Sequence, residues 1–297
     1  MKIFNHEVTA GLLRGWWNED VQGLRYWNLR ENGVDACYEK GKKAKFAGHD
    51  YLYVGNQNNL PVDLAFEDGI AKHEQRLITL ANALWQGKGD QQLLAKYAQT
   101  ALPAITASAV RSKWGLDGVG KVLQLDERKR VAWLKNNSET TYKSFLNWDF
   151  TFRQSTDAPL LICDSPLFDF RWRMNSADDN MRFCFMPLGP HAAVTGESSF
   201  RRNMYSPATV LGKVKNPPRA NNSFRLAKIS LPLNIVSHFN TLTLHRARGW
   251  VVAKSREELL KHADFLQPHN LAERIKSDRE RSEFCVTLNR LQRHHLI

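Results

Sequence analysis

Cysteine is scarce in this chain, and its four cysteines are widely spaced. They are Cys37, Cys163, Cys184 and Cys285. No two of them form the Cys-x-x-Cys pair of a zinc knuckle, a zinc ribbon or a thioredoxin site. Each is adjacent to apolar or aromatic residues, which favours buried free thiols. Because reduced cysteines are typical of the cytosol, we expect a cytoplasmic protein.

The chain also lacks long apolar runs. Its first seven residues, Met1 to Glu7, do not show the basic and then apolar pattern of a signal peptide. No stretch approaches the ~18 consecutive apolar residues that are needed to span a bilayer. The basic residues do not follow an amphipathic helical stripe either, so we do not expect a membrane as partner.

Carboxylates are missing from one long segment. The formal net charge is +12, and the first 200 residues contribute little to it, with 24 basic and 23 acidic side chains. The 59 residues from Ser198 to Arg256, here called the basic segment, hold eleven Lys or Arg and no Asp or Glu. Solvated faces usually mix the two signs, whereas one-sided charge attracts polyanions. This predicts DNA or RNA as partner; the alternative is that the charge serves solubility alone or is neutralised by carboxylates elsewhere in the fold.

Aromatic residues, in contrast, are plentiful, with nine Trp and fifteen Phe. Apolar residues at helical spacing predict three long helices, followed by a strand-rich half with one more helix. An Asn32-Gly33 pair predicts an early hairpin. The whole pattern indicates an α+β fold with a helical layer packed with antiparallel strands. We expect a single large domain or two closely packed lobes, a hairpin plus helical lobe over 1–148 and a strand-rich lobe over 149–297. The predicted helices are 61–87, 91–114 with Pro103 inside, 126–147 and 232–248, and the predicted later strands are 149–153, 159–163, 181–186, 191–195 and 249–253.

Two common phosphate and metal motifs fit poorly. The run from Gly115 to Lys121 has the bare spacing of a phosphate-binding loop, but Val122 stands where that loop needs Ser or Thr to hold magnesium. The acidic residues near Asp126 have the spacing of a PD-(D/E)xK nuclease site, but an acidic first turn of a helix explains them better. We assign no site to either motif.

Three other carboxylates are better candidates for chemistry. Glu67 and Glu74 are seven residues apart, so they share one face of a helix. Glu74 lies beside an apolar stripe that includes His73, where a carboxylate must be paired, protonated or metal-bound. Two interpretations stay open for it: an ion pair with an arginine, or a metal ligand or base. Asp164 follows a predicted strand, where with Ser165 it either caps a turn or forms part of a site.

These fragments, in this order, resemble a bacterial and phage family known as DUF 4238. Its members open with Asn-His-His-Tyr-x-Pro-x-x-x-Leu, which is similar to Asn5-His6 followed by Leu12 to Trp16, although the second His, the Tyr and the Pro are missing here. The family's helix with two Glu seven apart is similar to Glu67 and Glu74. Three further family elements have counterparts here. The family's strand end is similar to Leu161–Pro166, and its turn is similar to Pro187–Pro190. Its late helix, which leads into an aromatic strand, resembles Phe239–Thr241 followed by Trp250–Val252.

The resemblance covers nearly the whole chain. Because family members are similar to cargo of mobile elements and phage-defence loci, it implies a role in phage–host conflict, such as antiviral defence, rather than in metabolism. Combined with the basic segment, it suggests a nucleic-acid-acting protein.

Our leading hypothesis is a metal-dependent nuclease that uses Mg²⁺ or Mn²⁺. Glu67 and Asp164 would hold the cation, and Glu74 or His6 would act as general base. The alternatives are a non-catalytic nucleic-acid-binding or phage-sensing adaptor, and a basic surface that binds an acidic protein partner. The predicted phosphate contacts are Arg201, Arg202, Lys213, Lys215, Arg219 and Arg225.

Overall fold

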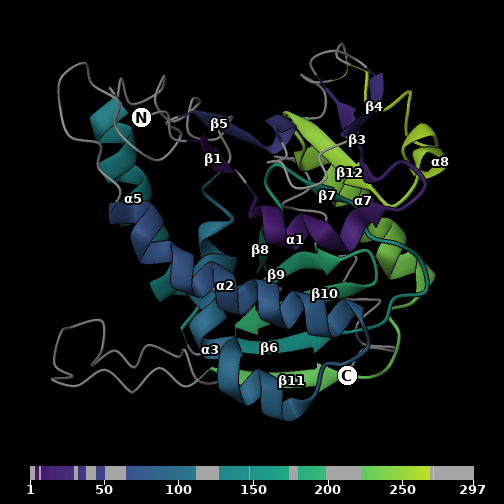
Figure 1. Ribbon diagram of the computed structural model, residues 1–297. Helices are drawn as coiled ribbons and strands as arrows, with labels where there is room; N and C mark the ends of the chain where they lie inside the picture. Colours follow the sequence, from purple (N-terminus) through teal and green to yellow (C-terminus); the bar gives the residue numbers. More distant parts are fainter. Residues whose placement is uncertain are drawn as a thin grey trace, which may run out of the picture.

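The protein has an α+β fold, as the sequence predicts (Figure 1). The computed structural model describes residues 4–6, 8–29, 33–37, 45–50, 65–111, 127–146, 148–173, 180–198, 222–267 and 270. Within these residues, six α-helices and two five-stranded, mostly antiparallel sheets pack into one body. No helix in this part of the chain is long and apolar enough to cross a membrane.

The first sheet has the strand order β11-β6-β10-β9-β8. Its only parallel pair is β11 with β6, and the other neighbours are antiparallel. Buried and half-buried side chains alternate along β6, so that Trp148, Phe150 and Phe152 all face the core. The strands are β6 (Trp148–Arg153), β8 (Phe168–Arg173), β9 (Asn180–Gly189), β10 (Ala192–Ser198) and β11 (Ser223–Ala227).

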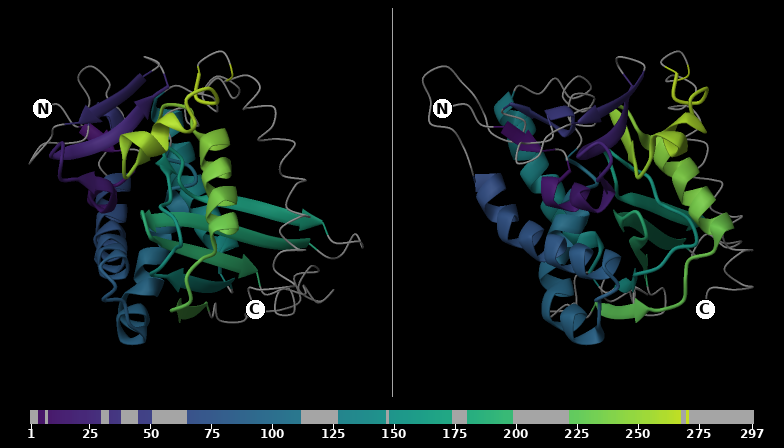
Figure 2. Two further views of the ribbon diagram at one scale, coloured as in Figure 1. Left: turned by 90° about the vertical axis from the view of Figure 1, so that its right-hand side faces the viewer. Right: turned by 45° about the vertical axis from the view of Figure 1, so that its right-hand side comes forward.

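Helices cover both faces of this sheet. Helices α2 (Ala65–Trp85) and α3 (Gln91–Ala107) pack together on the face that carries the β6 aromatics. Helix α7 (Leu233–Arg246) packs on the opposite face, where the rings of Phe185 and Phe239 stack with their centres 3.7 Å apart. In Figure 2, α7 runs from the first sheet towards the second sheet.

The second sheet combines strands from both ends of the chain. Its order is β2-β3-β12-β7, with β4 on the far side of β3. The predicted hairpin is present, since Asn28 of β3 faces Gly33 of β4. Strand β12 lies between β3 and β7, so the sheet crosses the predicted boundary between 148 and 149. The strands are β2 (Trp17–Asn18), β3 (Gly23–Asn28), β4 (Gly33–Cys37), β7 (Ile162–Cys163) and β12 (Trp250–Ala253).

The remaining elements are mostly short. Strands β1 (Phe4–His6) and β5 (Gly48–Asp50) form an antiparallel pair. Two 3₁₀ turns complete the described structure. The other helices are α1 (Ala10–Leu13), α5 (Glu127–Ser144) and α8 (Arg256–Leu260).

Several boundaries differ from the prediction. Helix α3 ends at Ala107 instead of reaching Trp114, and strands β8 and β11 were not predicted.

Of the predicted strand 159–163, only β7 pairs as a strand. The backbone before it bonds to side chains instead: Asn240 accepts from Leu161 N at 2.8 Å and donates to Pro159 O at 3.0 Å. Trp16 Nε1 donates to the next carbonyl, that of Leu160, at 2.7 Å.

Candidate functional site

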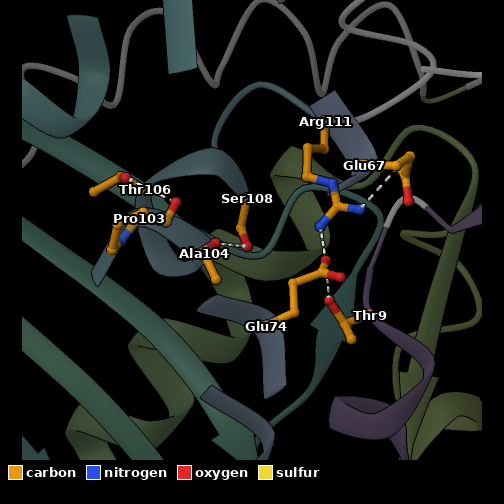
Figure 3. A network of polar contacts seen from close by, with 8 residues as sticks. All are labelled: Thr9, Glu67, Glu74, Pro103, Ala104, Thr106, Ser108 and Arg111. Carbon is orange, nitrogen blue, oxygen red and sulfur yellow. Dashed lines mark hydrogen bonds and ion pairs between the residues drawn. The ribbon is translucent and has the colours of Figure 1, made fainter. Parts of the chain in front are cut away.

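Helix α2 places Glu67 and Glu74 on either side of a buried arginine (Figure 3). Arg111 follows the end of α3, and its side chain is only 3% exposed. Its Nη1 forms an ion pair with Glu74 Oε1, and its Nη2 lies 3.8 Å from Glu67 Oε1. The Thr9 hydroxyl donates a hydrogen bond of 2.6 Å to the same Glu74 oxygen. The structure thus brings together two of the three predicted carboxylates, through a cation that the sequence analysis did not identify.

The network explains how a carboxylate beside an apolar stripe is tolerated. Glu74 is 14% exposed and Glu67 27%, and both compensate the buried charge of Arg111. Glu74 Oε1 accepts from both Arg111 and Thr9. The geometry therefore favours the ion-pair interpretation of Glu74. The assignments of Glu74 as base and of Glu67 as metal ligand stay predictions.

The end of α3 directs Arg111 towards α2. Pro103 lies inside this helix, and two hydroxyl groups bond to backbone carbonyls of its last turns (Figure 3). The Thr106 hydroxyl donates to the Pro103 carbonyl at 3.1 Å, and the Ser108 hydroxyl donates to the Ala104 carbonyl at 3.0 Å. A separate contact links the two helices, because His73 Nδ1 lies 2.6 Å from the Thr100 carbonyl oxygen.

Asp164 belongs to a different set of contacts. It is fully buried at the end of β7, and its Oδ1 accepts a hydrogen bond of 3.0 Å from the backbone N–H of Arg248. The Arg248 side chain donates to the carbonyls of His245 at 2.6 Å and Ala247 at 3.2 Å. Asp164 thus fixes the end of β7 to the turn between α7 and β12, 84 positions along the chain, and its assignment as a metal ligand stays a prediction. The two predicted metal ligands, Glu67 and Asp164, have different partners.

A mixed-charge cluster that the sequence analysis missed lies on the first sheet, on the side of β6 opposite its buried aromatics. Asp149 of β6 and Glu197 of β10 lie opposite each other, and the Ser223 hydroxyl donates to Asp149. Burial raises the pKa of Glu197, Asp149 raises it further, and Arg225 and Arg153 oppose this. Burial also lowers the pKa of Arg153, which Glu197 opposes. The alternation of Asp149, Thr151 and Arg153 with the β6 aromatics is the pattern that could have indicated this cluster.

The other predicted site residues are only partly described. The backbone of His6 lies in β1 opposite Gly48, and Arg225 is exposed on β11. Within the described ranges, no group of three or more His, Cys, Asp or Glu side chains could hold a metal ion. The use of Mg²⁺ or Mn²⁺ stays a prediction. The predicted phosphate contacts Arg201, Arg202, Lys213, Lys215 and Arg219 lie outside the described residues.

Comparisons with models of protein families, with curated proteins and with solved structures find no match to this chain. The resemblance to DUF 4238 therefore stays a prediction.

Proposed function

We propose that the protein binds DNA or RNA through the phosphate backbone. The observation that carries this proposal is the basic segment, with eleven basic and no acidic residues between Ser198 and Arg256. Lysine and arginine that neutralise phosphates release condensed counterions, which drives binding without sequence readout. Four basic residues of the segment are exposed in the described part of the chain: Arg225, Lys228, Lys254 and Arg256.

The contacts of Glu67, Glu74 and Asp164 support binding more than chemistry at these residues. Each of them has a basic or backbone partner inside the protein. A carboxylate that is paired with an arginine already has its charge compensated, so it gains less from binding a cation or taking a proton from water. A binding function needs only the charge of the basic segment.

Binding is tested by titrating labelled single- and double-stranded oligonucleotides at several salt concentrations. We expect the logarithm of the association constant to fall linearly with the logarithm of salt concentration. Binding that is independent of salt would contradict the proposal. Co-purification of an acidic protein at low salt, together with no affinity for either nucleic acid, would instead identify a protein partner.

We carry a metal-dependent nuclease as a second proposal, because of the Asp149 and Glu197 pair. Two carboxylates that face each other repel, and a divalent cation between them would relieve this repulsion. The pair also lies beside both ends of 199–221, the stretch that holds five predicted phosphate contacts. A role in phage–host conflict rests on the resemblance to DUF 4238 alone.

The nuclease proposal is tested by incubation with DNA and RNA in Mg²⁺ or Mn²⁺. Cleavage that Glu197→Gln abolishes and Glu74→Gln retains would place the reaction at the pair on the first sheet. Cleavage that Glu74→Gln abolishes and Glu197→Gln retains would place the reaction at the α2 carboxylates. The absence of cleavage under all these conditions would leave the binding proposal alone.

A further inference from the structure

Arg246, the last residue of α7, is held in place by two uncharged groups. Its Nε donates a hydrogen bond of 3.3 Å to Ser165 Oγ, and its guanidinium lies over the ring of Phe168, 5.2 Å from the ring centre. Ser165 and Phe168 are buried, whereas Arg246 is half-buried. One edge and one face of the guanidinium are therefore fixed by neighbours that carry no charge.

The charge of Arg246 is not compensated by an ion pair. Across the described ranges, no carboxylate bonds its guanidinium, and its two terminal Nη groups have no hydrogen-bond partner. Asp164, the residue before Ser165, accepts from the Arg248 backbone instead. A guanidinium that is held in place and has no acid bonded to it in the described part of the chain can receive an anionic group from outside the chain.

A second positive charge reinforces the first. Arg248 is anchored by hydrogen bonds from Nη1 to two backbone carbonyls, and both Arg246 and Arg248 act electrostatically on the buried Cys163. The charge of Arg248 adds to the positive potential at Arg246. Because the basic segment contains no acid, neighbours in the sequence do not neutralise it.

We propose that Arg246 is a phosphate-contact residue, whose terminal Nη1 and Nη2 bind two oxygens of one backbone phosphate. The planar fork of a guanidinium matches the geometry of a phosphate, and a side chain that is already fixed loses little entropy on binding. Ser165 and Phe168 are positioning residues, and the Arg248 charge strengthens the attraction. This inference rests on the proposed function and deepens it, since it names a contact that the sequence analysis did not select.

The test compares Arg246→Gln with Arg256→Gln in oligonucleotide binding. Arg256 is exposed in the same basic segment, so the two variants lose the same charge, but no hydrogen bond or ring contact holds the Arg256 side chain within the described residues. We expect Arg246→Gln to weaken binding by about tenfold and to lower the salt slope by about one, and Arg256→Gln to weaken it by about twofold or less. Ser165→Ala keeps the charge and should weaken binding by a few fold, because the fork is less well fixed.

Equal losses in the two variants would overturn the inference while leaving the proposed function standing. If the wild-type protein binds no oligonucleotide, the proposed function fails, and thermal unfolding with inorganic phosphate then decides the inference. An increase in Tm that Arg246→Gln abolishes supports the site, whereas an equal increase in both proteins overturns it. If Arg246→Gln does not fold, Arg246→Lys serves instead, because it keeps the charge and loses the fork.

Discussion

Arg111 places a full positive charge inside the protein, and its surroundings show what this requires. Removing a guanidinium from water costs several kcal/mol, which two carboxylates offset here, and the Thr9 hydroxyl donates to one of them, Glu74. The two glutamates share one face of α2, and the cation beside both offsets the repulsion between them. The side chain of Arg111 therefore joins α2, the end of α3 and the start of α1 in one contact set.

We expect Arg111→Met to lower the free energy of unfolding by about 3 kcal/mol, because it leaves two carboxylates facing each other without their cation. Urea denaturation measures this change. The control is Arg76→Met on helix α2. The Arg76 guanidinium lies over the Tyr97 ring, 4.9 Å from the ring centre, and has no ion pair among the described residues. That variant should lose at most about 1 kcal/mol. Equal losses in the two variants would show that the ion pairs contribute no more than packing.

Glu197 gives a prediction with a defined pH dependence. Its folded pKa lies above the ordinary value of 4.5, so the folded state binds the proton more tightly than the unfolded state does. The cost of ionising Glu197 is therefore absent at pH values below 4.5 and fully present above its folded pKa. We expect Glu197→Gln to gain stability relative to wild type as pH rises from about 4 to about 7, measured as the difference in Tm.

Glu139 is the matched control, because its pKa is lowered, mainly by its hydrogen bond and charge interaction with Lys143. Its stabilising effect is present above the unfolded value of 4.5 and is lost as pH falls through the folded pKa. Glu139→Gln should therefore show a small change of the opposite sign. The same pH trend in both variants would contradict the assignment of the Glu197 shift to burial.

At the scale of elements, the sequence predicts most helices and some strands. Helices α2, α3, α5 and α7 follow from apolar spacing, because a 3.6-residue period needs no knowledge of the partner. Strand β8 alternates strictly between aromatic and charged residues from Phe168 to Arg173, which is the pattern of a half-buried strand. Strand β11 is different: it is short and pairs in parallel with β6, so its pairing depends on tertiary contacts.

The stretch 159–161 shows why an apolar run need not become a strand. Asn240 of α7, which is 7% exposed, bonds to its backbone in the way a neighbouring strand would. A single buried amide thus replaces two ladder hydrogen bonds. Residue composition alone gives no sign of this, because the Asn lies 79 positions along the chain from Leu161.

We expect Asn240→Leu to lower the free energy of unfolding by about 2–3 kcal/mol, because it leaves the buried Leu161 N–H and the partly buried Pro159 carbonyl without this partner. Asn137→Leu on α5 is the control, since that amide makes one local hydrogen bond of 2.8 Å to the Trp133 carbonyl. It should lose about 1 kcal/mol or less. Hydrogen exchange provides a second measurement: the Leu161 amide should exchange faster only in Asn240→Leu.

For the whole molecule, the main core includes residues from both halves of the chain. Leu12 and Leu80 lie in the same cluster as Phe150, Met186 and Val252. The sequence suggests two lobes that meet near residue 148, because composition changes there, and it contains no signal that β3 pairs with β12. Long-range pairing of this kind, like the pairing of Arg111 with Glu74, is decided by packing rather than by local pattern.

Separate expression of 1–148 and 149–297 tests the two-lobe prediction. We expect neither fragment to unfold cooperatively alone, because each lacks part of the main core and part of the second sheet. Mixing the two fragments should restore a cooperative thermal transition by circular dichroism. A sharp transition in either fragment alone would instead show an autonomous lobe.

The pairing of β3 with β12 also has a consequence during synthesis. Asn18 and Lys254, which are joined by a hydrogen bond beside this sheet, lie 236 positions apart. At about 5–20 residues per second, the N-terminal hairpin waits on the order of 10–50 s after leaving the ribosome before its partner strand emerges. Until then, Arg25 to Asn28 of β3 have no native strand along the edge that will receive β12. A trigger factor or another early-acting chaperone that shields this edge should therefore increase the yield of folded protein.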